Sequence, residues 1–362
     1  MDLDQFRLRD KKMAETLIDK IQEADVDLKI MHVCGTHQDT LVRFGLEDML
    51  KESGIRIIQG PGCPVCVTTP REVQEIITLA ENGITMTVFG DMIKVPGEKR
   101  SLMHAKEEGG DVRVVYGIDD AVEMAEDTDK PVVFMSIGFE TTTPSTASVL
   151  ARGAPDNFFV LCCNRVIPPA LEAIINMGEL DLHGLIEPGH VSTIIGTRPY
   201  EFISREHGIP QVIAGFEPLD VLMAVHMLVK QVKEGRAEVE NEYDRVVKTE
   251  GNPEAQRLVE QVFRRVDTDW RGFPVIPDSG LELRDEYARH DARMEFSHLL
   301  EEVRTRAYRE RDDCLCGEVL RGITEPRECL LFGKGCTPGD PVGPCMVSRE
   351  GSCNIAFRYS GR

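Results

Sequence analysis

The chain has 362 residues, enough for two or three domains, and 41% of them are hydrophobic, an ordinary share for a globular protein. A formal net charge of −20 argues against non-specific binding to nucleic acid or to an anionic membrane surface. No apolar run is long enough to cross a bilayer, and the polar N-terminal segment is unlike a signal peptide, so we expect a cytoplasmic protein.

One pattern recurs between residues 28 and 235: a short apolar run, a turn rich in Gly and Pro, and an amphipathic stretch. This alternation predicts βαβ units and parallel sheets. Strands are expected at 28–33, 55–60, 84–90, 112–117, 131–138, 158–163, 183–189 and 210–216, and helices at 38–51, 70–81, 118–125, 145–151, 168–175 and 218–233. Eight strands are many for one sheet, so we expect two α/β domains, 1–125 and 126–235.

The third expected region, 236–362, differs from the first two in composition and pattern. Residues 236–270 are charged and predict a pair of connector helices outside the sheets, and residues 285–310 predict one more helix. Six of the eleven cysteines follow in a loop-rich tail that has too few apolar runs to build its own core. A bound metal would supply the missing cross-links, because formation of such a site is coupled to folding.

The unusual loops of the sequence all follow expected strands. They are CGTH (34–37), GPGCPVC (60–66), GDMIKVPG (90–97), GFETTTP (138–144), EPGH (187–190) and GFEPLD (215–220). Ligands of open parallel sheets bind at the carboxyl ends of the strands. We therefore expect these loops to line the edges of the two domains, with the two edges facing each other across a cleft.

Cys63 and Cys66 form a Cys-x-x-Cys pair directly before an expected helix. The amides and positive dipole of a helix N-terminus lower the pKa of the first thiol of such a pair, and Pro64 stiffens the turn. A redox-active dithiol is the favoured interpretation. Half of a zinc site and a tight turn with two buried thiols are the alternatives, and no second pair stands nearby at zinc-like spacing.

Cys34 and His37 lie in the first of these loops. A lone cysteine there would more often be structural than functional. A third thiol at the same sheet edge as a Cys-x-x-Cys pair changes this, because three thiols can hold a soft metal, or one can bind metal while two exchange electrons. His37 would then be a partner base or a group that supports the metal ligand.

Other polar side chains in these loops have weaker signals. Glu140 lies where it could cap a helix, and phosphate binding there is disfavoured because no P-loop lysine follows. His190 and Glu217 could transfer protons or bind a ligand, or could simply stabilise turns. Cys162 and Cys163 end an apolar strand and are expected to be core thiols.

The tail carries the stronger metal signal, because four of its thiolates would satisfy a 4Fe-4S cluster. The cysteines that match this best are Cys316, Cys329, Cys336 and Cys353. Their irregular spacing favours a cluster over zinc, which is usually held by paired cysteines, and over unliganded thiols. Spacing does not choose between Cys314 and Cys316 as the first ligand, and it does not exclude Cys345.

Taken together, the motifs resemble those of the HypD family of NiFe-hydrogenase maturation factors. The resemblance runs over nearly the full chain, in the same order, through CGTH, GPGCPVC, GDMIKVPG, GFETTTP, EPGHVS, GFEPLD and the tail CLCGEVL…CLLFGKGCTP…VGPCMVSREGSC. It implies a scaffold that assembles the Fe(CN)2CO unit of the hydrogenase, works with a HypC-type small chaperone, receives cyanide from a HypE-type protein and carries a C-terminal 4Fe-4S cluster.

The resemblance also assigns residues. Cys34 would bind the transient iron with its CN and CO ligands at the contact with the chaperone, which would bring a second thiolate. Cys63 and Cys66 would be a redox pair that relays electrons from the cluster, and His37 would lie beside the iron thiol. The residues that the family motifs place at the cleft are Glu140, His190 and Glu217. A stand-alone thiol-disulfide oxidoreductase with a structural cluster, or a zinc-stabilised binding module, would be the other classes.

Overall fold

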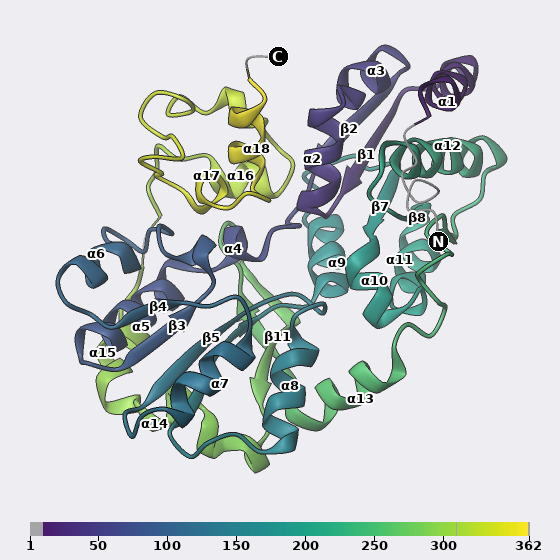
Figure 1. Cartoon of the computed structure of the whole chain (residues 1–362). Helices are drawn as coiled ribbons and strands as arrows, with labels where there is room; N and C mark the ends of the chain where they lie inside the picture. Colours follow the sequence, from purple (N-terminus) through teal and green to yellow (C-terminus); the bar gives the residue numbers. More distant parts are fainter. Residues whose placement is uncertain (1–9, 309, 361–362) are drawn as a thin grey trace.

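Two parallel sheets organise the chain in the computed structural model, which describes residues 10–308 and 310–360 (Figure 1). The strands of sheet A, in spatial order, are β2 (Ile55–Gln59), β1 (Leu28–His32), β7 (Gly184–Pro188), β8 (Gln211–Ala214) and β9 (Val239–Asn241). The strands of sheet B are β4 (Val112–Val114), β3 (Thr85–Val88), β5 (Val132–Gly138) and β6 (Phe158–Asn164). The predicted α/β class with parallel sheets is confirmed, and all eight expected strands form.

The chain visits the two sheets in an interleaved order. It builds β1 and β2 in sheet A, then β3 to β6 in sheet B, and returns to sheet A for β7 to β9. The expected boundary between residues 125 and 126 therefore does not separate the sheets, since β3 and β4 precede it and β5 and β6 follow it in the same sheet. Local periodicity sets which residues form strands, whereas pairing is decided by packing between distant segments.

Helices cover the faces of both sheets. Those of the α/β part are α1 (Lys11–Glu23), α2 (Gly35–Arg43), α3 (Leu46–Glu52), α4 (Pro64–Val67), α5 (Pro70–Glu81), η2 (Gly90–Met92), α6 (Leu102–Glu107), α7 (Ile118–Glu126), α8 (Thr143–Arg152), α9 (Ile167–Met177), α10 (Gly189–Ile195), η3 (Arg198–Tyr200), α11 (Glu201–His207) and α12 (Pro218–Glu234). Helices α1, α2, α3 and α12 share one core with sheet A. The other face of sheet A shares a second core with sheet B, which joins the two halves.

Three expected helices have different bounds. The stretch 38–51 divides into α2 and α3 at Gly45, whose φ of 68° interrupts the helix. The expected connector pair within 236–270 is wrong, because the segment forms β9, one helix, α13 (Pro253–Val262), and strand β10 (Phe263–Asp269). Strand β10 pairs antiparallel with β11 (Val275–Leu283), and Phe263 is buried in the core on the outer face of sheet B.

The expected helix at 285–310 is also interrupted. It becomes η4 (Asp285–His290), α14 (Ala292–Glu295) and α15 (Ser297–Thr305). Asp291 has extended backbone angles, and its carboxylate accepts hydrogen bonds from the amides of Arg293 and Met294. A side chain that caps a new helical turn in this way ends the preceding turn.

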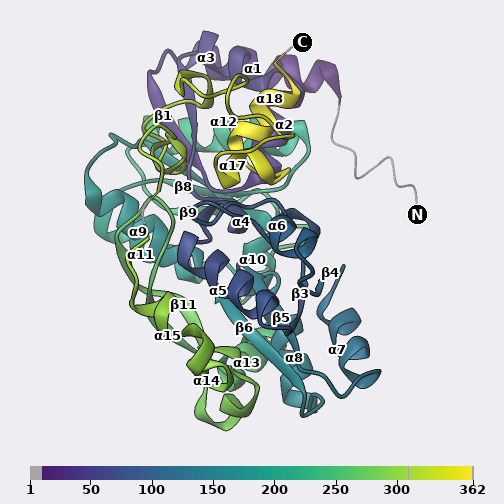
Figure 2. The same ribbon diagram turned by 90° about the vertical axis from the view of Figure 1, so that its left-hand side faces the viewer.

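The tail is loop-rich, as expected, and contains α16 (Cys316–Leu320), η5 (Pro326–Glu328), α17 (Pro344–Val347) and α18 (Ser352–Arg358). Helix α17 packs against α4, which follows β2, and α18 packs against α2, which follows β1. The tail therefore lies over the two helices that start at the carboxyl edge of sheet A (Figure 2). Within the described residues, no helix combines the length and apolar character needed to span a membrane.

Candidate functional site

Three cysteines lie at the carboxyl edge of sheet A. Cys34 follows β1 and is the N-cap of α2, while Cys63 follows β2 and is the N-cap of α4. Because β1 and β2 are parallel neighbours, the two loops meet at the same edge. A Cβ atom on Gly62 would lie 2.2 Å from the backbone nitrogen of Cys34, so glycine is needed for this close approach of the loops.

Cys63 and Cys66 are joined by a disulfide, with Cα atoms 5.2 Å apart. The Cys63 sulfur accepts a hydrogen bond from the backbone N–H of Cys66 over 3.2 Å, at the start of α4. Only 1% of Cys63 and none of Cys66 is exposed. The pair therefore has the spacing of an exchangeable dithiol but is screened from bulk solvent.

Cys34 is a buried thiol that holds its proton. Burial raises its pKa to about 11, although the amides of Thr36 and His37 act in the opposite direction. Glu350 of the tail contributes to the increase, and its backbone packs directly against Gly35. Since metals bind the thiolate, a cation that binds Cys34 must displace this proton.

His37 is fully buried at the start of α2, and its Nε2 lies 2.9 Å from the carbonyl oxygen of Gly215. Burial lowers the pKa of His37 to about 4, so the ring is neutral at pH 7 and Nε2–H donates to that carbonyl. Phe216 stacks on the exposed His190, with ring centroids 3.9 Å apart, and meets His37 at a tilt of 31°, with centroids 5.2 Å apart. The two predicted histidines thus contact the same phenylalanine ring.

Glu140 does not cap its own helix. It follows β5, and one carboxylate oxygen accepts a hydrogen bond of 3.0 Å from the backbone N–H of Ile167, the first residue of α9. Its other oxygen is buried and has no partner in the described part of the chain. Burial raises the pKa of Glu140 to about 7.

Glu217 is the N-cap of α12, where it forms a capping box with Asp220. Such a box satisfies two amides at the helix start, which is a structural role. Cys162 and Cys163 are buried core thiols, as expected, and burial raises the pKa of both.

Two polar residues near the site carried no distinct sequence signal as site residues. Glu187, the penultimate residue of β7, is fully buried, and burial raises its pKa to about 8. Tyr200 is also fully buried. Burial is the largest cause that raises its pKa, and negative charge on Glu187, Glu140 or Cys34 raises it further. The sequence offered one clue to Glu187, because a glutamate is unusual at the end of an apolar strand.

The six tail cysteines line one small cavity. They are Cys314, Cys316, Cys329, Cys336, Cys345 and Cys353. Among residues 10–308 and 310–360, no three His, Cys, Asp or Glu side chains converge as ligands of a single metal ion. The donor set is nevertheless purely thiol, in apolar surroundings that include Val319 and Met346. A donor set of several soft thiols in such surroundings fits an iron-sulfur cluster.

Contacts from the tail tie this cavity to the sheet edge. Ser348 donates a hydrogen bond of 3.2 Å to Asp91 in the loop after β3. Arg358 and Tyr359 both donate to Asp39 on α2, over 3.0 and 3.2 Å. The helix that begins at Cys34 is therefore held by the same segment that carries Cys353.

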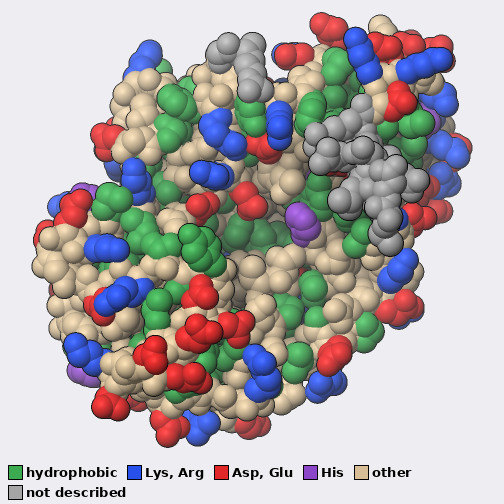
Figure 3. Space-filling view, in the orientation of Figure 1, with side chains coloured by type: hydrophobic (Ala, Val, Ile, Leu, Met, Phe, Trp, Pro, Cys, Tyr) green, Lys and Arg blue, Asp and Glu red, His purple; other side chains and the backbone are tan. Residues whose placement is uncertain are grey.

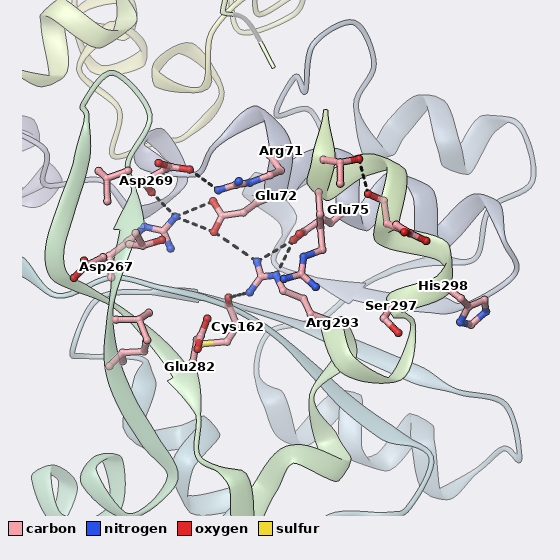
Figure 4. Close-up of a pocket in the computed structure, with 18 residues that line it drawn as sticks. Arg71, Glu72, Glu75, Cys162, Asp267, Asp269, Glu282, Arg293, Ser297 and His298 are labelled. Atoms are coloured by element: carbon pink, nitrogen blue, oxygen red, sulfur yellow. Dashed lines mark hydrogen bonds and ion pairs between the residues drawn. The ribbon is translucent and has the colours of Figure 1, made fainter. Parts of the chain in front are cut away.

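A larger pocket, of about 870 Å³, lies elsewhere, between α5, the β10–β11 hairpin and α15 (Figure 4). Two ion pairs cross it: a buried pair, Arg165 with Glu72 over 2.8 Å, and a partly buried pair, Arg293 with Glu75 over 2.9 Å. These charges satisfy one another, and the one cysteine at the pocket is the core thiol Cys162. We therefore place the functional site at the thiols and not in this pocket.

Acidic and basic side chains are interspersed over the face of the molecule seen in Figure 3. This face has no continuous basic surface, in keeping with the net charge of −20. It offers no electrostatic footprint for a nucleic acid.

Comparison with known proteins decides the family. A family model described as "HypD: Hydrogenase formation hypA family" matches residues 11–360. The chain belongs to the HypD family. A HypD2 hydrogenase maturation factor of Bradyrhizobium diazoefficiens is 45% identical over 98% of this chain and 96% of its own length. A HypD hydrogenase maturation factor of Cupriavidus necator is 44% identical over 91% and 89%.

A further relative, from Methanocaldococcus jannaschii, is named for hydrogenase expression and formation and is 46% identical over 98% of this chain and 99% of its own length. The HypD match includes the sheet edge with Cys34, Cys63 and Cys66 as well as the cysteine-rich tail. Both thiol regions therefore lie inside the part of the chain that defines the family.

Proposed function

We propose that this HypD protein is the scaffold on which the Fe(CN)2CO unit of a NiFe-hydrogenase is assembled. The observation that supports this most directly is the placement of three groups of thiols together. Cys34 stands beside the Cys63–Cys66 disulfide at one sheet edge, and the cavity with six tail cysteines packs over the helices that both loops begin. Membership of a hydrogenase maturation family supports the metal unit of a hydrogenase as the substrate of this site.

Cys34 is the proposed thiol that holds the iron. A soft thiolate suits low-spin iron with cyanide and carbonyl ligands, and burial excludes water from it. Neutral His37 lies on the same helix and supports the loop through Gly215. His190 and Glu140 are proposed to line a cleft between the two sheet edges, and Glu217 contributes by fixing the loop that carries Phe216.

The Cys63–Cys66 pair is proposed to store the two electrons of one redox step. Reduction of the disulfide takes up two electrons and two protons and leaves two thiols, and oxidation returns them. A one-electron iron-sulfur donor is the required reductant class. The location of the pair at the start of α4, in contact with α17 of the tail, supports entry of electrons from that side.

The tail is proposed to be an iron-sulfur domain. The residues that would hold a 4Fe-4S cluster are Cys316, Cys329, Cys336 and Cys353. When bound, such a cluster supplies single electrons. Cys314 and Cys345 line the same cavity as Cys316, so they compete for a place in the ligand set.

The partners follow from the chemistry. We propose that a HypC-type small chaperone completes the iron site with a second thiolate beside Cys34, and that a HypE-type protein delivers cyanide. The complex is proposed to work in the cytoplasm. The alternative of a stand-alone thiol-disulfide oxidoreductase is less well supported, because such enzymes attack their substrates with an accessible thiol and both thiols here are buried.

Maturation of a NiFe-hydrogenase in a strain that lacks its own HypD tests this proposal. Cys34→Ala, Cys63→Ala and Cys66→Ala should each abolish hydrogenase activity, while Cys162→Ala, a matched change at a core thiol, should leave most of it. Full activity with Cys34→Ala would exclude the iron-scaffold function. Full activity with Cys63→Ala or Cys66→Ala would exclude the redox role alone.

A further inference from the structure

The turn between β10 and β11, residues 270–274, lies against the helix that carries the disulfide. The backbone N–H of Arg271 donates a hydrogen bond of 2.9 Å to the carbonyl oxygen of Val67, the residue after Cys66. Trp270, the neighbour of Arg271, is 1% exposed and packs in the same hydrophobic core as Cys66. The turn is therefore fixed directly beside the redox pair.

The same turn contacts the wall of the cavity that the six tail cysteines line. Gly272 has a φ of 80°, and a Cβ atom on it would lie 2.5 Å from the Cα atom of Gly317. A larger residue would therefore be strained and would clash with α16, so glycine is needed for this close approach. Gly317 directly follows Cys316, a proposed cluster ligand. One turn thus touches both thiol groups that are proposed to carry electrons.

Arg271 places a buried positive charge in this turn, since the residue is only 4% exposed. Its Nη2 donates a hydrogen bond of 3.0 Å to the carbonyl oxygen of Pro96, whereas Nε is buried and has no partner among the described residues. Within residues 10–308 and 310–360, no carboxylate forms an ion pair with it. Burying a charge without a countercharge is costly, which points to a negatively charged group that completes the site when bound.

The cysteine cavity fits such a group. The positive charge of Arg271 acts on two thiols that line it, Cys314 and Cys345, and favours their thiolate forms. Arg311 also lies close to Cys314, but its side chain is 56% exposed and pairs with Asp313. A 4Fe-4S cluster with four thiolate ligands carries net negative charge, and reduction by one electron adds to it. A guanidinium keeps its charge throughout the physiological pH range, so it can balance that charge permanently.

We propose that Arg271 supplies a fixed positive charge beside the tail cluster and makes the cluster easier to reduce. This inference rests on the proposed iron-sulfur domain. A nearby cation stabilises the reduced, more negative state of a cluster relative to the oxidised state, and it does so most strongly in a low-dielectric interior. The loop GDMIKVPG gains a role as well, because the carbonyl oxygen of Pro96 fixes the guanidinium.

A redox titration of the cluster tests this charge. Arg271→Gln removes the charge and keeps a polar side chain, whereas Arg271→Lys keeps the charge. The full chain is loaded with its cluster without oxygen, iron and acid-labile sulfide are counted, and the midpoint potential is read from the EPR signal of the reduced cluster. In Arg271→Gln we expect the equilibrium constant of one-electron reduction to fall by about tenfold, a shift of about 59 mV to lower potential. Arg271→Lys should stay within about threefold of the wild type.

Arg152→Gln is the matched control. Arg152 ends α8 and its side chain is 68% exposed, so water and salt screen its charge and the potential should not change. An unchanged potential in Arg271→Gln, or an equal fall in Arg271→Gln and Arg271→Lys, would overturn the inference and leave the iron-sulfur domain in place. A wild-type chain that binds no iron and sulfide would instead overturn the iron-sulfur domain itself.

The outcome is also decided if Arg271→Gln does not hold a cluster. Retention of the cluster by Arg271→Lys, at nearly the potential of the wild type, would show that the positive charge is needed, as proposed. Loss of the cluster from both variants would show that the shape of the arginine is required and not its charge, which would overturn the inference.

Discussion

Two regions of this molecule each bury a pair of glutamates, but only one region provides the arginines that neutralise their charge. In the pocket beside α5, burial alone would raise the pKa of Glu72, but the charges of Arg165 and Arg293 outweigh it and lower the pKa. Glu187 at the end of β7 and Glu140 after β5 form no ion pair among the described residues, and burial raises the pKa of both. Pairing fixes a charge and serves stability, whereas an unpaired acid keeps a proton that it can exchange.

The largest expected effect comes from breaking the paired region. Arg165→Met should lower the free energy of unfolding by about 3 to 5 kcal/mol, because it leaves Glu72 buried without its closest cation. Denaturant unfolding measures this. Arg113→Met is the matched control: its side chain is 59% exposed and its pair with Asp111 is worth at most about 1 kcal/mol. An equal loss of free energy of unfolding in Arg165→Met and Arg113→Met would refute the distinction between the buried and the exposed ion pair.

The unpaired region should show itself in the pH dependence of stability. The folded pKa of Glu187, about 8, lies above its ordinary value of 4.5, so its contribution is complete below pH 4.5 and is lost as the pH rises through 8. Between pH 5 and pH 8 this one group should lower the free energy of unfolding by about 3 kcal/mol. Glu187→Gln should flatten the curve over that range, and a curve with unchanged slope would contradict the buried neutral acid.

The reactivity of Cys34 is the next largest effect. With its pKa raised from 9.0 to about 11, the thiol of the metal-free protein holds roughly 100-fold less thiolate at pH 7 than an ordinary cysteine. Alkylation by iodoacetamide, followed by mass spectrometry, should be at least about 100-fold slower than at an introduced surface thiol, Glu126→Cys. Comparable rates at the two positions would show that Cys34 is neither buried nor protonated as described.

The smallest effect is expected where the tail docks on α2. Asp39→Asn weakens the contacts with Arg358 and Tyr359, which are partly exposed, so the free energy of unfolding should fall by no more than about 1 kcal/mol. Denaturant unfolding of this variant beside Arg165→Met compares an exposed pair with a buried one directly. A loss of several kcal/mol would mean that this contact holds the whole tail in place.

The sequence predicted the strands well because each is a short apolar run between turns. It did not predict that β7 joins β1 in sheet A, since pairing between distant segments leaves no local pattern. The predicted helix at 38–51 and the predicted pair of helices within 236–270 were wrong for different reasons. A positive φ ended the first, and burial of Phe263 against sheet B turned part of the second into a strand.

The candidate site was predictable where a motif carried its chemistry. Cys34, Cys63 and Cys66 stood in distinctive loops, and the strand order brought them to one edge. Glu187, although it stands in the EPGH loop, is distinguished by a buried carboxyl group without a hydrogen-bond partner among the described residues, and Tyr200 by its complete burial. Both are properties of the folded chain and not of a residue pattern. The choice among the tail cysteines stays a prediction for a similar reason: all six line the same cavity.

An infrared spectrum shows directly whether Cys34 holds the iron unit. The protein would be purified without oxygen after co-expression with the HypC-type and HypE-type partners, as wild type, Cys34→Ala and the core-thiol control Cys162→Ala. We expect iron-bound cyanide and carbonyl bands in the wild type and the control, and their absence from Cys34→Ala. Bands of equal intensity in Cys34→Ala would contradict this expectation, because the iron unit would then be held somewhere other than at this thiol.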